Sequence, residues 1–138
     1  MATRIKDIAS TATQEATDDY LPLDGATNGT RKVLPLQIRR IPQQSKTAAY
    51  TLVAADSGQH ISTTTGGVTV PSGVFSAGDA VTIFNNSASN QTITQGTSVT
   101  MRQAGTANTG NRTLAQYGLC TVLCVASNTF VITGSGLS

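Results

Sequence analysis

The sequence predicts an all-β protein in which an antiparallel β-sandwich or jelly-roll-like domain follows an extended N-terminal anchor segment. Residues 46–138 alternate Thr or Ser with Val, Ile or Leu, which is typical of strands with one buried face. Gly- and Asn-rich turns interrupt this alternation about every 8–12 residues, as in sandwiches and related all-β folds. Most charged residues and three of the four prolines lie instead in residues 1–45. We therefore predict two parts, an attachment segment (1–45) and a β-domain (46–138).

Length and charge limit the classes of partner. With 138 residues the chain is long enough for one core, and the low aromatic share of 4% means that aliphatic side chains must fill it. A net charge of +2 with 12% charged residues is too weak for nucleic-acid or acidic-membrane binding. No apolar run approaches the ~20 residues of a membrane helix, and the N-terminus lacks a signal-peptide core. We expect synthesis in a cytoplasm, with neither nucleic acid nor membrane as a partner.

The first part begins with a predicted short helix within residues 2–20, whose apolar stripe is thin. An irregular β-hairpin should follow, because "DYLPLDG" and "RKVLPLQI" are extended stretches separated by turn-forming residues. A lone hairpin cannot bury all of its apolar residues. We predict that these residues attach the protein to a larger particle: Tyr20, Leu21, Leu23, Val33, Leu34, Leu36 and Ile38.

A polar, Pro-containing linker is expected near "IRRIPQQSKTAAY", at the boundary between the two parts. Short strands should follow it, while a helical reading is disfavoured because Thr, Val and Gly are poor helix formers. The expected strands cover residues 50–54, 60–62, 68–70, 80–84, 92–94, 98–102, 121–125 and 129–133.

Candidate catalytic residues are few. His60 is the single histidine, and the β-domain holds two carboxylates, Asp56 and Asp79, in the turn-like settings "ADSG" and "AGDA". Loop hydrogen bonding explains both carboxylates. A triad of Ser57, His60 and Asp56 would have to form within one turn and lacks a nucleophile elbow. We expect no catalytic residues and no cofactor, with a polysaccharide-cleaving enzyme using Asp56 and Asp79 as a further hypothesis.

Two cysteines, Cys120 and Cys124, occur in "LCTVLC". In a strand they would share one face about 13 Å apart at ~3.3 Å per residue, which is too far for a disulfide. We interpret them as small buried apolar residues. A zinc site that adds His60 would lack a fourth ligand, so no metal is expected.

Uncharged polar loops are the remaining functional signal. "NNSASNQ" (85–91) and "TANTGN" (106–111) are rich in Asn, Ser and Thr, and Arg102 and Arg112 flank the second loop. Loops of this kind on a rigid sheet can bind glycans or proteins, or serve only as solvated turns.

Several stretches together resemble a β-module of tailed-bacteriophage virion proteins, found in tail fibres and in appendage or decoration proteins. They are "YTLVAADSGQHI" (50–61), "VTVPSGVFSAGDAVTIFNNS" (68–87), "TITQGTSVTMR" (92–102) and "RTLAQYGLCTVLCVASNTFVITGSG" (112–136), and the last is the most specific. The opening "DDYLPLDG" with "TRK" resembles an attachment hairpin of such proteins.

This resemblance implies a non-enzymatic virion structural protein, assembled in the host cytoplasm as a homotrimer and bound to a phage capsid or tail protein. A short fibre or appendage and a capsid decoration (cement) protein both fit the resemblance. The alternative is a host-surface carbohydrate-binding module of a tail fibre, which would make a host glycan a partner.

Overall fold

The computed structural model describes residues 21–23, 31–33 and 40–138, and the chain divides into two units, residues 1–40 and 41–138. In the first unit, β1 (Leu21–Leu23) pairs antiparallel with β2 (Arg31–Val33). The sequence predicts an irregular hairpin over this stretch, whose connecting residues 24–30 lie outside the described residues. The predicted anchor residues Leu21, Leu23 and Val33 belong to these two strands. Outside the described residues lie the expected helix and the other predicted anchor residues, Tyr20, Leu34, Leu36 and Ile38.

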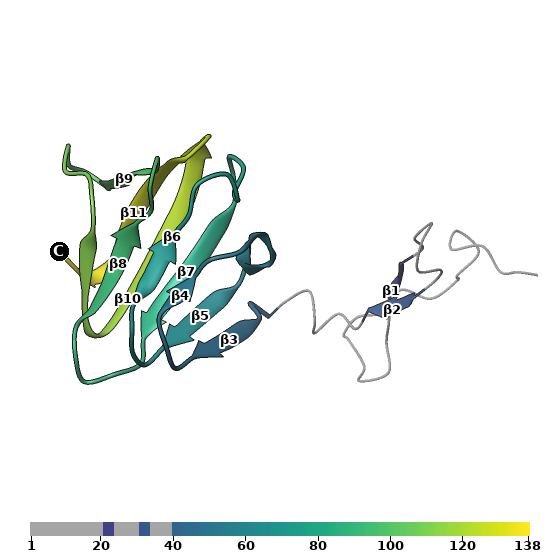
Figure 1. Ribbon diagram of the computed structural model, residues 1–138. Helices are drawn as coiled ribbons and strands as arrows, with labels where there is room; N and C mark the ends of the chain where they lie inside the picture. The colour runs from purple at the N-terminus through teal and green to yellow at the C-terminus, as the bar shows by residue number, and fades with distance from the viewer. Residues whose placement is uncertain (1–20, 24–30, 34–39) are drawn as a thin grey trace, which may run out of the picture. The chain divides into compact units, whose positions relative to one another are not determined.

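The second unit consists of nine strands and one short 3-10 turn, drawn in Figure 1. Strand content is 54% against 3% helix, which confirms the all-β fold class. The elements are β3 (Gln43–Lys46), β4 (Tyr50–Thr51), η2 (Ala54–Asp56), β5 (His60–Thr63), β6 (Val68–Val70), β7 (Ala80–Asn85), β8 (Gln91–Gln95), β9 (Thr100–Gln103), β10 (Arg112–Ala126) and β11 (Thr129–Leu137).

Successive strands from β3 to β8 alternate between two parallel stacks. One stack is β3, β5 and β7, and the other is β4, β6 and β8. The chain thus winds in coils of two strands, one from each stack. Gln43 lies beside His60, and His60 lies beside Thr82, one coil further along the chain in each case.

The long strand β10 joins the two stacks. Its first residues, Arg112–Leu114, pair antiparallel with β8, and its later residues, Leu119–Leu123, pair antiparallel with β7. Strand β11 pairs antiparallel with β10 and parallel with β9. The resulting order β3-β5-β7-β10-β8-β6-β4 starts and ends at strands that are consecutive in the chain, so the sheet is nearly closed.

The strand directions correct one part of the sequence prediction. Antiparallel pairing holds for β1 with β2 and for β10 with its three partners, whereas the other five pairs are parallel. The two-residue alternation of apolar and polar side chains indicates which face of a strand is buried. It does not indicate whether neighbouring strands run parallel or antiparallel. Parallel neighbours need a long crossover, which here is a strand of the opposite stack in place of the usual helix.

Strand β3 lies within the stretch that the sequence predicts as a linker. Its residues, Gln43–Lys46, include no aliphatic side chain and so give no strand signal. The backbone of β3 pairs with β5, and β3 forms one end of the sheet path. Pro42 before the strand and Lys46 within it are residue types that disfavour further pairing at an exposed edge.

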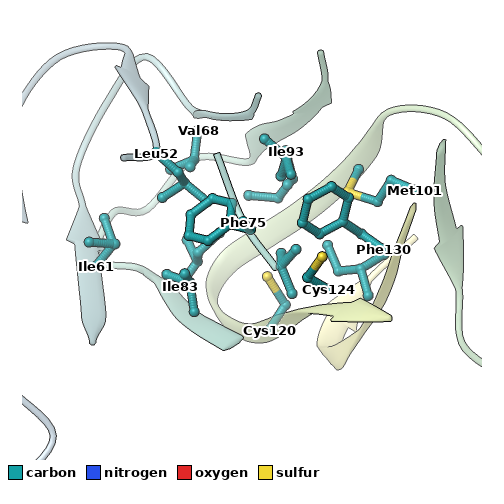
Figure 2. Close-up of a cluster of buried hydrophobic side chains, with 14 of the residues drawn as sticks. Leu52, Ile61, Val68, Phe75, Ile83, Ile93, Met101, Cys120, Cys124 and Phe130 are labelled. Carbon is teal, nitrogen blue, oxygen red and sulfur yellow. The ribbon is translucent and has the colours of Figure 1, made fainter. Parts of the chain in front are cut away.

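Inward-facing side chains of both stacks form one core, shown in Figure 2. Val81 and Ile83 of β7 are almost fully buried, while the intervening Thr82 and Phe84 are half-buried. Phe75 and Phe130 meet edge to face with their ring centroids 6.1 Å apart. The remaining core is mostly aliphatic, as the low aromatic content predicts.

Candidate functional site

Asp56 is fully buried, and hydrogen bonds from three donors engage its carboxylate. The Tyr50 hydroxyl and the Val53 backbone N–H donate to Oδ2 at 2.9 and 2.8 Å, and the Gln44 side-chain amide donates to Oδ1 at 2.9 Å. Burial of Tyr50 raises the pKa of its hydroxyl, as do its hydrogen bond to Asp56 and the negative charge of Asp56. Asp56 therefore links β3, β4 and η2, which is a structural role.

Asp79 is bound by a different set of donors. The Ser57 hydroxyl donates to Oδ1 at 2.7 Å, and the Ser76 backbone N–H donates to Oδ2 at 2.8 Å. The Ser76 N–H, followed by the Ser57 hydroxyl, lowers the pKa of Asp79. The loop hydrogen bonding predicted for Asp56 and Asp79 is thus confirmed. The two carboxylates share none of these donors.

The hypothetical serine triad is not assembled by these contacts. Ser57 donates its hydroxyl hydrogen to Asp79, not to His60. Within the described part of the chain, Nε2 of His60 is buried without a hydrogen-bond partner. The imidazole ring lies edge-on to Phe84, with 6.3 Å between ring centroids. His60 is thus placed against an aromatic side chain of β7.

Cys120 and Cys124 are free thiols in the core, which confirms their interpretation as buried apolar residues. Burial raises the pKa of Cys120 to about 12. Burial and then the charge of Asp79 raise the pKa of Cys124. Both side chains are neutral at pH 7 as a result. In residues 40–138 and the two short strands, no group of three or more His, Cys, Asp or Glu could hold a metal ion.

The polar loop 85–91 supports an irregular part of β10. The fully buried Asn85 donates from Nδ2 to the carbonyl oxygens of Leu114 and Ala115, at 3.1 and 2.8 Å. Further along the loop, the carbonyl of Ser87 accepts from the Tyr117 N–H at 3.2 Å, and Oδ1 of Asn90 accepts from the Gln116 N–H at 3.3 Å. The side chains of Asn85 and Asn90 and the backbone carbonyl of Ser87 thus hold the neighbouring strand β10.

The second polar loop is hydrogen-bonded to the end of β8. Oδ1 of Asn111 accepts from the Gln95 N–H at 2.9 Å, and Oε1 of Gln95 accepts from the Gly110 N–H at 3.1 Å. Arg112 donates from Nη1 to the carbonyl of Asn111 at 2.9 Å, whereas Arg102 is exposed.

An exposed apolar surface on β10 is a feature that the sequence reasoning missed. Even-numbered residues from Cys120 to Cys124 face the core, and odd-numbered ones face outward. We define the β10 outer face by its large exposed side chains, which are Tyr117 (61% exposed), Leu119 (46%), Leu123 (39%) and Val125 (44%). The signal was present in "LCTVLCVA", where apolar residues occupy both phases of the alternation, a pattern of strands covered on both faces.

Comparison with protein-family models, with curated proteins and with solved structures finds no match to this chain. The described residues include no helix with the length and hydropathy needed to cross a membrane. The resemblance to phage virion proteins therefore depends on the sequence motifs alone.

Proposed function

We propose that the protein is a non-enzymatic structural protein of a bacteriophage virion, either a short trimeric fibre or appendage or a capsid decoration (cement) protein. The observation that carries this proposal is that the polar side chains of the β-domain hold its fold together, whereas its exposed apolar side chains are free for contacts. Asp56, Asp79 and Asn85 hold the fold together, while the large exposed side chains of β10 are apolar. This arrangement supports a rigid body that makes protein contacts.

The low charge of the β-domain supports the same proposal. Residues 46–138 contain three bases, two acids and one histidine. Closely packed subunits must remove water from the charges at their contacts, which is costly when those charges are unpaired. A surface with few charges reduces this cost. The pattern thus favours an assembly of closely packed copies.

Residues 1–45 supply the attachment in this proposal, through Tyr20, Leu21, Leu23, Val33, Leu34, Leu36 and Ile38. Their partner is a phage capsid or tail protein with an apolar groove. Nearby charged residues set the register by complementary charge. The motif "DDYLPLDG" is the feature of this segment that resembles attachment hairpins.

Co-sedimentation with phage particles that lack the protein tests the attachment. The full chain should bind, and the double variant Leu34→Asp/Leu36→Asp should not. Asn28→Asp, in the predicted turn, adds one negative charge as a control and should bind as the unmodified chain does. Equal binding by the double variant and the unmodified chain would contradict an apolar anchor.

A deletion complements these substitutions, and the structure defines its boundary. Removal of residues 1–40 leaves β3 intact, whereas removal of residues 1–45 would cut through β3. The shortened chain should retain its β-type circular dichroism spectrum and lose particle binding. Binding by a folded chain without residues 1–40 would place the attachment in the β-domain.

The alternative function is a host-surface carbohydrate-binding module, which relies on the two polar loops. Asn90 and Asn111 each accept a hydrogen bond from a backbone N–H, so these oxygens already have a structural partner. This favours the structural proposal. A glycan array with the purified full chain separates the two, because saturable binding to one polysaccharide class would favour the alternative.

A further inference from the structure

Strand β10 presents one apolar surface outward while its opposite surface belongs to the core. Leu119, Leu123 and Val125 stand at alternate positions of the outer face, interrupted by the half-buried Thr121. In the neighbouring strands, Leu119 lies beside Phe84 of β7, and Leu123 lies beside Val131 of β11. Phe84 and Val131 are themselves half-buried, so the apolar surface spreads over three strands.

Tyr117 is held at the end of this surface in an unusual backbone conformation. Its φ is +56°, a region that costs an L-residue about 1–2 kcal/mol. It lies within the irregular pairing between Leu114 and Leu119, and bulges of this kind redirect side chains. The carbonyl of Ser87 holds the Tyr117 N–H. The fold thus maintains a strained position that displays a large aromatic side chain.

The strands beside the β10 outer face contribute few charges. The residues that pair with Leu119, Thr121 and Leu123 are neutral: Ala80, Thr82, Phe84, Val131, Thr133 and Ser135. One strand further out, the exposed Arg102 of β9 pairs with Val131 and places a positive charge beside this surface. A symmetric contact between identical chains brings a surface against its own copy or a neighbouring part of it. Like charges would repel each other there, and a surface whose paired residues are neutral, with Arg102 one strand further out, limits that repulsion. A strongly charged partner would require several complementary charges, and Arg102 supplies a single one.

The size of the surface fits the centre of a protein interface. From their exposed fractions, the four defining side chains present roughly 400 Å² in total, at the scale of the largest functional patches of monomers. A standard interface buries about 800 Å² per partner, with an apolar centre and a polar rim. Thr82, Thr121 and Thr133 form a row across the middle of this surface, between Leu119 and Leu123, and add polar groups to the contact.

We propose that the β10 outer face binds a second copy of this chain, with Leu123 inside the contact and Tyr117 at its end. This inference deepens the homotrimer of the proposed function by naming its interface. It does not depend on attachment to a particle, because the surface belongs wholly to the β-domain.

Analytical ultracentrifugation of the purified full chain, without particles, tests the interface. Over about 1–100 µM the mass should be a multiple of 14.2 kDa. Leu123→Glu should raise the dissociation constant at least tenfold, since it buries an unpaired charge in the contact. Thr106→Glu, in an exposed loop, adds the same charge as a matched control and should associate normally. A mass of 14.2 kDa throughout, or equal association of both variants, would overturn the proposal.

A second measurement keeps the test valid if Leu123→Glu does not fold. Val125→Cys places a thiol on the β10 outer face, while the two native thiols remain buried. Its reaction with a maleimide should slow at least tenfold from the lowest to the highest protein concentration. A rate independent of concentration would overturn the interface. Particle co-sedimentation reports separately on attachment, so failure of one proposal is distinguishable from failure of the other.

Discussion

The side-chain amide of Asn85 donates a hydrogen bond of 2.8 Å to the carbonyl oxygen of Ala115. Asn85 ends β7, and Ala115 lies in the part of β10 between the residues that pair with β8 and those that pair with β7. The amide also reaches the carbonyl oxygens of Leu114 and Ser89. One buried side chain thus supplies donors where β10 passes from one stack to the other.

Asn85→Ala should destabilise the protein by about 2–3 kcal/mol, because it leaves buried carbonyl groups without their donor. Urea unfolding followed by circular dichroism measures this change. Asn86→Ala is the control, since Asn86 is exposed, and should stay within about 0.5 kcal/mol. Equal effects of both variants would argue against the role of the Asn85 amide.

Asp56→Ala should cost about 3 kcal/mol of unfolding free energy, since it removes the acceptor of Tyr50, Gln44 and Val53. Tyr50→Phe removes a single donor and should cost about 1 kcal/mol. A double-mutant cycle from urea unfolding gives the coupling between the two side chains. Coupling near zero would contradict the central position of Asp56 in this network.

Asp79 should contribute stability that depends on pH. Its folded pKa is lowered from 3.8, so the contribution is present above that unfolded value and is lost as pH falls through the lower folded value. In urea unfolding between pH 7 and pH 2, Asp79→Asn should be less stable than the unmodified chain near neutrality. The difference should shrink toward the acid end, as Asp79 becomes protonated. A difference that persists unchanged to pH 2 would contradict this assignment.

The native thiols should be unreactive. Because burial raises the pKa of both cysteines, the folded protein should react with Ellman's reagent at pH 8 at well under a tenth of the rate in denaturant. Two thiols per chain should react after unfolding, because both are free. Rapid reaction of one thiol in the folded protein would mean that it is accessible.

Gly134→Ala should destabilise the protein by about 3 kcal/mol or more. The added Cβ would lie 2.1 Å from the carbonyl oxygen of Leu119 and 2.5 Å from Cα of Cys120, both of which are backbone atoms. Gly105→Ala is the comparison, because its φ is +74° and nothing lies within 4 Å of the new atom. It should cost only about 1 kcal/mol, from backbone strain. Similar costs at both sites would show that the close contact is relieved.

The local alternation of apolar and polar residues predicted the positions of the strands better than which strands pair and in which direction. In β7 the alternation of Val81 and Ile83 with Thr82 is visible in the sequence, and the strand lies where the pattern places it. Strand β3 was missed because Gln43–Lys46 has no apolar residue and is held by backbone pairing and by the contact of Gln44 with Asp56. Strand direction was missed because it depends on which distant segments pair.

The β10 outer face could not be predicted from the local pattern either. The sequence analysis interprets Cys120 and Cys124 as buried residues, and the structure agrees. Leu119, Leu123 and Val125 have the same chemistry in the opposite phase, so the pattern alone does not say which set meets the core. Tyr117 was unpredictable in a stronger sense, because the local pattern indicates neither its left-handed backbone nor the hydrogen bond of its N–H to Ser87 in another segment.

The winding of β3 to β8 has a consequence for how proteins of this design can change in length. Each coil returns the chain to its own stack, displaced by one strand, after 17 residues from Gln43 to His60 or 22 from His60 to Thr82. Duplication or loss of one such coil would shift the stack by about 4.8 Å and leave every other pairing in place. The length of each stack can therefore change only in whole coils. Strand β10 would still pair with the last strand of each stack, as it does here with β7 and β8.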